Sequence, residues 1–260
     1  MKIVHCSDLH FGRDEANLLP AFKASLAGIA PDLVVVSGDF TQHGWHAEFE
    51  KARNFLRGLP CPFFAVPGNH DIPGYHHLVE RFTQPYARYR RYINEDICPV
   101  LEMPKTVFGG INSARRLLPH WNWANGAVSE SQLQQLEDVF SRANGRWKIC
   151  VLHHPVHAVE NAPIDVRVFG AKRTLRAFAR LGVDLVMTGH MHRASARILQ
   201  QQGQHTVYLN ASTALSTRLR DDENGFNLVS LEENRLTIEF WKYRSGAFTG
   251  VESLTHQRAR

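Results

Sequence analysis

The stretch LVVVSGDF (residues 33–40) decides how this 260-residue chain folds. Four apolar residues, most of them β-branched, predict a buried strand, and a glycine followed by an aspartate ends it. Helical patterns flank this strand. In residues 45–59, for example, apolar side chains recur three and four positions apart, which is typical of one buried helical face. A strand between two helices predicts an α/β unit built on a parallel sheet.

The same alternation continues through most of the chain. We expect helices at residues 16–30, 45–59, 129–144 and 171–181, and strands at residues 2–6, 32–36, 62–66, 149–152 and 185–188. A further helical segment at residues 76–97 should break at Pro85. Beyond His192 the pattern changes to strands joined by polar turns, at residues 195–199, 206–210, 226–231 and 236–241. We therefore expect one domain over residues 1–260, in which antiparallel strands of about residues 195–245 complete a second sheet packed on the first.

Composition and charge narrow the class of protein. The formal net charge is +5 and the sequence pI is near 9.2, but the lysines and arginines are scattered. This indicates mild attraction to anionic substrates and argues against nucleic acid as a partner. The four cysteines include no Cys-x-x-Cys pair, which argues against a zinc–cysteine site and for a reduced protein. No apolar run suits a signal peptide or a membrane span, so we expect a cytoplasmic protein without an integral membrane segment.

Polar clusters directly follow five of the predicted strands. They are Asp8-Leu9-His10, Gly38-Asp39, Gly68-Asn69-His70-Asp71, His153-His154-Pro155 and Gly189-His190-Met191-His192. In an α/β sheet, ligands bind outside the carboxyl ends of the strands, so these clusters should share one edge. Residues two apart in an extended chain point the same way, so Asp8 and His10 can face one metal together, and His190 and His192 can both face the metal pair. Aspartate, asparagine and histidine converging without cysteine predict a two-metal hydrolytic centre.

The five clusters, in this order, resemble the calcineurin-like metallophosphoesterase superfamily over about the first three quarters of the chain. The resemblance implies a four-layer α/β/β/α sandwich, in which helices flank two mixed sheets and the metal site lies at the carboxyl ends of the strands. It also implies hydrolysis of a phosphoester by attack of a metal-bridging hydroxide on phosphorus.

The resemblance assigns a role to each matching residue. It implies one metal ion on Asp8, His10 and His192, another on Asn69, His153 and His190, and a bridge between the two by Asp39. His70 becomes the catalytic residue, placed to protonate the leaving oxygen or to stabilise charge in the transition state. His153 and His154 compete for one ligand position, because neighbours in a strand point to opposite faces, and the family pattern favours His153. Such ligands suit Mn, Fe, Zn or Co.

The loops between the clusters should select the ester. Residues 38–44 and 66–71 are similar to the class III cyclic nucleotide phosphodiesterase branch and its glycerophosphodiesterase relatives. This similarity implies a phosphodiesterase acting on cyclic nucleotides or other small phosphodiesters. The candidate substrate contacts are His43, Arg115 and His154, together with the Arg- and Trp-rich loop from Asn112 to Trp123, which departs from that branch.

Other functions stay open at this point. One is a pyrophosphatase acting on a nucleotide-sugar lipid intermediate, as in the UDP-diacylglucosamine hydrolase relatives, which would need an apolar groove for acyl chains. Another is a nuclease like the calcineurin-like subunit of double-strand-break repair. The non-enzyme alternative is a metal-binding scaffold of the same fold, as in the retromer subunit relative. A homodimer is equally open.

Overall fold

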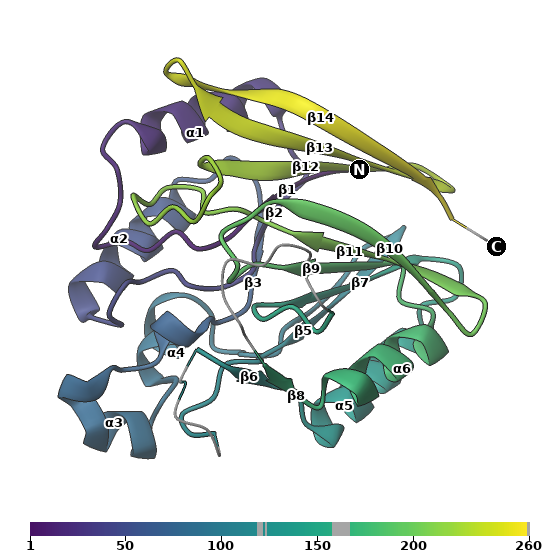
Figure 1. Cartoon of the computed structure of the whole chain (residues 1–260), viewed down its shortest axis with the longest axis horizontal. Helices are drawn as coiled ribbons and strands as arrows, with labels where there is room; N and C mark the ends of the chain where they lie inside the picture. Colours follow the sequence, from purple (N-terminus) through teal and green to yellow (C-terminus); the bar gives the residue numbers. More distant parts are fainter. Residues whose placement is uncertain (119–121, 123, 158–166, 259–260) are drawn as a thin grey trace.

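Two six-stranded sheets form the centre of the molecule (Figure 1). The structure, a computed structural model, describes residues 1–118, 122, 124–157 and 167–258. Within these residues the first sheet has the strand order β14-β13-β12-β1-β2-β3, and the second has the order β10-β11-β9-β7-β5-β4. Strands β6 and β8 form a separate two-stranded ladder.

Both large sheets are mixed. Strands β1, β2 and β3 of the first sheet are parallel, as are β5, β7, β9 and β11 of the second, and antiparallel strands extend both groups. The first sheet comprises β1 (Lys2–Cys6), β2 (Leu33–Val36), β3 (Phe63–Ala65), β12 (Gly225–Leu231), β13 (Arg235–Arg244) and β14 (Ala247–Gln257). The second comprises β4 (Val100–Glu102), β5 (Thr106–Ile111), β7 (Trp147–Leu152), β9 (Leu185–Thr188), β10 (Ser195–Gln201) and β11 (Gln204–Asn210). The short pair is β6 (Gly126–Ala127) and β8 (Val168–Phe169).

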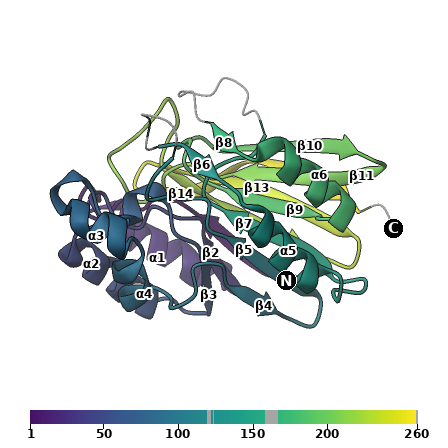
Figure 2. The same ribbon diagram turned by 90° about the horizontal axis from the view of Figure 1, so that it is seen from below.

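Three apolar cores separate four layers. Neighbouring side chains of a strand point to opposite faces, so in β2 Val35 packs between the sheets while Val34 packs outward, in the core that contains Phe22 and Phe49 of the covering helices. One pair of helices covers the first sheet and another pair covers the second (Figures 1 and 2). These helices are α1 (Leu18–Ile29) and α2 (His46–Arg57) on the first sheet, and α5 (Glu130–Phe140) and α6 (Ala171–Leu181) on the second. The predicted four-layer α/β/β/α sandwich is confirmed.

The strands beyond residue 195 do not all complete the second sheet, as the sequence had led us to expect. Strands β10 and β11 do so, but β12, β13 and β14 extend the first sheet, with β12 antiparallel to β1. The physical reason is that β12 is buried on both faces: Phe226 lies in the outer core and Val229 in the core between the sheets. A strand with two apolar faces fits the edge of either sheet, so its pattern does not select one.

The segment after β3 is helical and interrupted, as predicted from Pro85. Helix α3 (Leu78–Thr83) ends before that proline and α4 (Ala87–Tyr92) begins after it. Two short 3-10 turns, η1 (Asn69–Asp71) and η2 (Tyr75–His77), precede them. Within the residues that the structure describes, no helix combines the length and the apolar composition required for a membrane span.

Candidate metal centre

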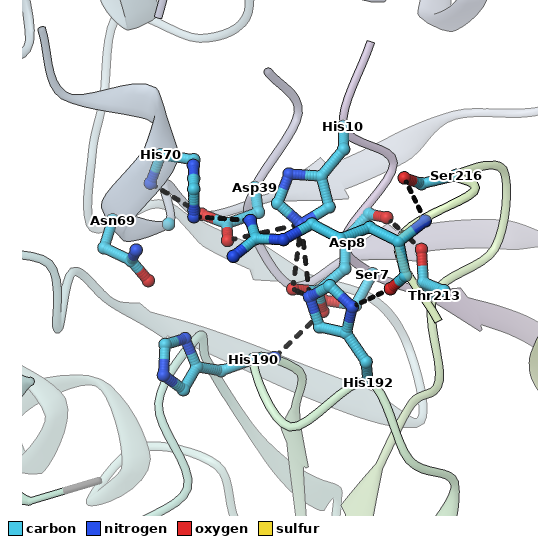
Figure 3. Close-up of polar contacts among 12 residues, drawn as sticks. Ser7, Asp8, His10, Asp39, Asn69, His70, His190, His192, Thr213 and Ser216 are labelled. Atoms are coloured by element: carbon cyan, nitrogen blue, oxygen red, sulfur yellow. Dashed lines mark hydrogen bonds and ion pairs between the residues drawn. The ribbon is translucent and has the colours of Figure 1, made fainter. Parts of the chain in front are cut away.

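The five polar clusters meet at the carboxyl ends of the parallel strands of both sheets. Strands β1, β2 and β3 of the first sheet lead into Asp8, His10, Asp39, Asn69 and His70, and β7 and β9 of the second lead into His153, His190 and His192. Asn69 and His70 are partly exposed, and the other six are buried. In Figure 3 the side chains of Asp8, His10 and His192 point toward one another. The predicted residues are therefore brought together.

Left-handed backbone places most of these side chains. The φ angles are 52° at Asp8, 44° at His10, 54° at Asp39, 69° at His190 and 53° at His192. Residues other than glycine rarely adopt such angles, and each one costs about 1–3 kcal/mol, which the surrounding structure must offset. Five such residues gathered at the carboxyl ends of the strands point to a functional site. They also show that the extended geometry assumed from the sequence is not how these side chains converge.

Glycines let two strand ends approach each other. Gly38 has a φ of 97°, and a Cβ atom there would lie 2.7 Å from Nδ1 of His153. A Cβ atom on Gly68 would lie 2.1 Å from Oδ1 of Asp39. Any larger residue at either position would push into the side chains of the centre.

The first group of ligand atoms comes from Asp8, His10 and His192. Nε2 of His192 lies 3.1 Å from Oδ1 of Asp8 and 3.2 Å from Nε2 of His10. Nδ1 of His10 is hydrogen-bonded to the backbone carbonyl of Thr41 at 3.2 Å. Nδ1 of His192 is hydrogen-bonded to the backbone carbonyl of Arg218 at 2.6 Å. A neutral imidazole that donates from Nδ1 carries a lone pair on Nε2. Two lone pairs facing each other beside a carboxylate fit a bound cation.

The second group comes from Asn69, His153 and His190. Nε2 of His153 lies 3.0 Å from Nδ1 of His190 and 3.2 Å from Oδ1 of Asn69. Its Nδ1 donates to the carbonyl of Ser37 at 2.8 Å, so Nε2 is again the atom aimed inward. This group has the same donor chemistry as the first, with an amide oxygen in place of a carboxylate.

One oxygen of Asp39 lies between the two groups. Its Oδ2 is 3.3 Å from Nε2 of His153 and 3.8 Å from Nε2 of His10. Its other oxygen, Oδ1, accepts a hydrogen bond of 2.8 Å from the backbone N–H of His70. The side chain is thereby fixed with Oδ2 free to face both groups.

The electrostatics of the centre follow from burial and from Asp39. Burial alone would raise the pKa of Asp39, but His153 and His70 outweigh it and hold that pKa well below its usual value. Burial alone would lower the pKa of His153, yet Asp39 raises it to about 9. Burial lowers the pKa of His70 to about 4, and burial together with Asp39 raises the pKa of Asp71 to about 7.

His70 lies beside the two groups and has a partner that the sequence motifs did not indicate. Its Nδ1 donates to the carbonyl of Gln42 at 2.7 Å, and its Nε2 accepts from Nη1 of Arg218 at 2.7 Å. Arg218 lies in the loop between β11 and β12, well beyond the last polar cluster. No motif marks it, because it lies within an irregular loop and not directly after a strand.

The three predicted substrate contacts lie in different surroundings. His43 lines a cavity of about 460 Å³ that also borders Asn69 and His70, and its ring lies 4.7 Å from that of Trp45. His154 is fully buried beside the second group, and possible ligand atoms of His153, His154 and His190 lie within 4.8 Å of one another. Nδ1 of His154 lies 2.8 Å from the hydroxyl of Ser113.

The guanidinium of Arg115 is directed elsewhere. It donates to the carbonyl of Asn112 at 2.7 Å and to the side chain of Gln132. The structure therefore does not bring Arg115 to the metal groups, and contact with a substrate would require these bonds to be exchanged. His120, Trp121 and Trp123 of the same loop lie outside the described residues.

Known proteins resemble this chain in sequence and in fold. A probable glycerophosphodiester phosphodiesterase of Arcobacter nitrofigilis is 25% identical over 65% of this chain, and the match covers 59% of that protein. A glycerophosphodiester phosphodiesterase of Enterobacter lignolyticus is 30% identical over 64% of this chain and 60% of its own length. A probable cyclic nucleotide phosphodiesterase of Synechococcus is 25% identical over 89% of this chain and 88% of its own.

The fold is also that of solved metallophosphatases. A dimetal phosphatase from Danio rerio superimposes with a TM-score of 0.70 over 100% of this chain and 99% of that structure, at 15% identity. Residues 1–194, which contain all five polar clusters, match the family of calcineurin-like phosphoesterases. This chain belongs to the calcineurin-like phosphoesterase family.

Proposed function

We propose that this protein is a metal-dependent phosphodiesterase with two metal ions. Asp8, His10 and His192 would hold one ion, Asn69, His153 and His190 the other, and Asp39 both. The observation that carries the proposal is Oδ2 of Asp39, which lies within 4 Å of an inward-facing imidazole nitrogen of each group. When bound, such ions lower the pKa of water and neutralise phosphoryl oxygens.

His70 is the proposed catalytic residue. Its pKa of about 4 keeps the ring neutral near pH 7, with the proton on Nδ1 because that atom donates to a carbonyl. Its Nε2 carries the lone pair that accepts from Arg218. Once that bond is broken, this atom can take a proton from the attacking water and pass it to the leaving oxygen. His70 also holds Asp39 through its backbone N–H, which couples catalysis to the position of the shared carboxylate.

The proposed substrates are cyclic nucleotides or other small phosphodiesters. The support is the names of the relatives and the cavity of about 460 Å³ beside His70, a size suited to a small organic ligand. His43 and Trp45 line this cavity with aromatic surface, on which a base can stack. We also propose a cytoplasmic location, which the four free cysteines favour and cell fractionation can test.

A turnover screen tests this function. The purified protein, loaded with manganese, is offered bis-p-nitrophenyl phosphate, the monoester, cyclic AMP, cyclic GMP, glycerophosphodiesters and UDP-diacylglucosamine, and the best substrate is repeated with iron, zinc and cobalt. We expect the diesters to turn over faster than the monoester. Preference for UDP-diacylglucosamine would favour the pyrophosphatase instead. Stoichiometric metal without turnover of any ester would favour a binding scaffold.

A further inference from the structure

We propose that Arg218 binds the phosphoryl group of the substrate by exchanging its bond to His70 for a bond to a non-bridging phosphoryl oxygen. This inference rests on the proposed function, because it names a residue that recognises the phosphoester at the same centre. Arg218 lies outside the five polar clusters and outside residues 1–194, which match the family.

The side chain of Arg218 already makes a hydrogen bond at the centre. Its Nη1 lies 2.7 Å from Nε2 of His70, and a guanidinium can only donate. Nε2 must therefore be the acceptor, which agrees with Nδ1 of the same ring donating to the carbonyl of Gln42. The guanidinium thus occupies the reactive atom of His70. Any substrate atom that uses Nε2 has to displace it.

Once displaced, the guanidinium needs a new acceptor nearby. Nitrogen or oxygen atoms of His10, Asp39 and His70 lie within 4.8 Å of one another, so the guanidinium, bonded to His70, already lies beside the metal groups. A phosphoryl oxygen brought to this position offers an anionic acceptor to the planar guanidinium, whose donors suit phosphate oxygens. The exchange keeps the guanidinium paired and frees the lone pair on Nε2 of His70, which can then take a proton from the attacking water and pass it to the leaving oxygen.

The backbone of Arg218 is held by bonds that do not involve its side chain. Its carbonyl accepts from Nδ1 of His192 at 2.6 Å, and its N–H donates to the hydroxyl of Ser216 at 3.1 Å. The preceding Thr217 donates to the carbonyl of Arg13 at 2.9 Å. The side chain is half-buried and extends from this anchor. Replacing Arg218 by alanine therefore removes the guanidinium and leaves the carbonyl that orients His192.

The experiment compares Arg218→Ala, Arg218→Lys and a control, Arg244→Ala. Arg244 is the last residue of β13, and its substitution removes an exposed ion pair with Glu223. In the manganese-loaded protein we expect Arg218→Ala to keep its metal content and to lose about 100-fold in kcat/KM for bis-p-nitrophenyl phosphate. The Ki for inorganic phosphate should rise about tenfold, because a charge-assisted bond is lost. Added guanidinium ion should restore part of the activity, and sodium at equal ionic strength should not. Lysine should rescue in part, and Arg244→Ala should match the wild type.

Several results would overturn the role of Arg218. They are a kcat/KM of Arg218→Ala within twofold of the wild type, a loss of metal from that variant, or an unchanged Ki for phosphate. If the wild type hydrolyses no ester, the proposed function has failed. Calorimetric titration of inorganic phosphate into the metal-loaded wild type and Arg218→Ala then decides: equal affinities reject Arg218 as a phosphate ligand, and weaker binding by the variant supports it.

Discussion

At the scale of single residues, backbone carbonyls orient the imidazoles of the centre. In three rings Nδ1 is hydrogen-bonded to a main-chain oxygen, so that Nε2 faces inward: His10, His153 and His192. Main-chain partners cannot be removed by a side-chain substitution, so the ligand geometry depends on the fold itself. Asp39 differs, because its shared position depends on its own carboxylate.

Asp39→Ala should abolish most of the activity. The substitution removes the one oxygen that faces both groups of ligand atoms, so we expect kcat/KM for the best diester to fall by at least about 10²- to 10³-fold. Bound manganese should also decrease, as measured by elemental analysis. Asp138→Ala, on the exposed face of α5, is the matched control. Turnover near that of the wild type in Asp39→Ala would contradict the two-metal centre.

Metal binding should strengthen as the pH rises toward 9. Asp39 raises the pKa of His153 to about 9, so in the metal-free protein Nε2 of His153 is protonated at pH 7 and must lose that proton to bind an ion. The apparent association constant for manganese should therefore rise about tenfold per pH unit between pH 6.5 and 8.5. Competition with a chelating indicator of known protonation measures it. A constant that stays flat over this range would show that His153 is already neutral.

The same raised pKa has a consequence for the metal-free fold. The folded value lies above the ordinary value of 6.5, so protonated His153 contributes stability that is fully present below about pH 6.5 and is lost as the pH rises through about 9. Bound metal removes this contribution to stability, because His153 is then neutral in the folded state.

At the scale of elements, the strands that precede the polar clusters were predictable and several others were not. Short apolar stretches that lead into a polar cluster marked β1, β2 and β9. Strand β5 was missed because Gly109 and Gly110 interrupt its apolar run, although the strand is buried throughout. A Cβ atom on Gly109 would lie 2.3 Å from Leu136 of α5, so the glycine reflects close helix packing that only the folded chain reveals.

The residues of the candidate site can also be divided into those that the sequence predicted and those that it did not. Order and spacing predicted Asp8, Asp39 and the other residues at strand ends, since the carboxyl ends of parallel strands share one edge. Arg218 could not be predicted, because it lies in an irregular loop between β11 and β12. The left-handed angles at the ligands were also missed, since no local residue preference requires them at aspartate or histidine.

Gly38→Ala should damage the end of β2. The φ of 97° is unfavourable for alanine, and the added Cβ would lie 2.8 Å from the backbone nitrogen of Gly68. We expect a loss of about 1–3 kcal/mol in the free energy of unfolding, together with weaker metal binding. The matched control is Gly28→Ala in α1, where the new Cβ meets nothing within 4 Å and helix propensity should raise stability. Urea titration of both variants checks this prediction, and equal stabilities would reject it.

At the scale of the whole molecule, each of the two proposed ions would connect the two sheets. Asp8 and His10 follow the first sheet and His192 follows the second, while Asn69 follows the first and His153 the second. The apolar core between the sheets already joins them along their length. Metal at the carboxyl ends would add a second connection at the edge where the polar clusters lie.

Metal loading should therefore raise the melting temperature of the whole chain in one transition. A ligand at 100 times its Kd stabilises the folded state by about 2.7 kcal/mol, which for a chain of this size corresponds to a rise in Tm of about 5–10 °C. We propose that residues 1–260 form a single domain, so differential scanning calorimetry should show one peak with and without manganese. Asp39→Ala should lose most of the rise, because its Oδ2 faces both groups of ligand atoms and would be shared by both ions. Two separate peaks, only one of which responds to metal, would instead mean that the sheets unfold independently and that the ions do not link them.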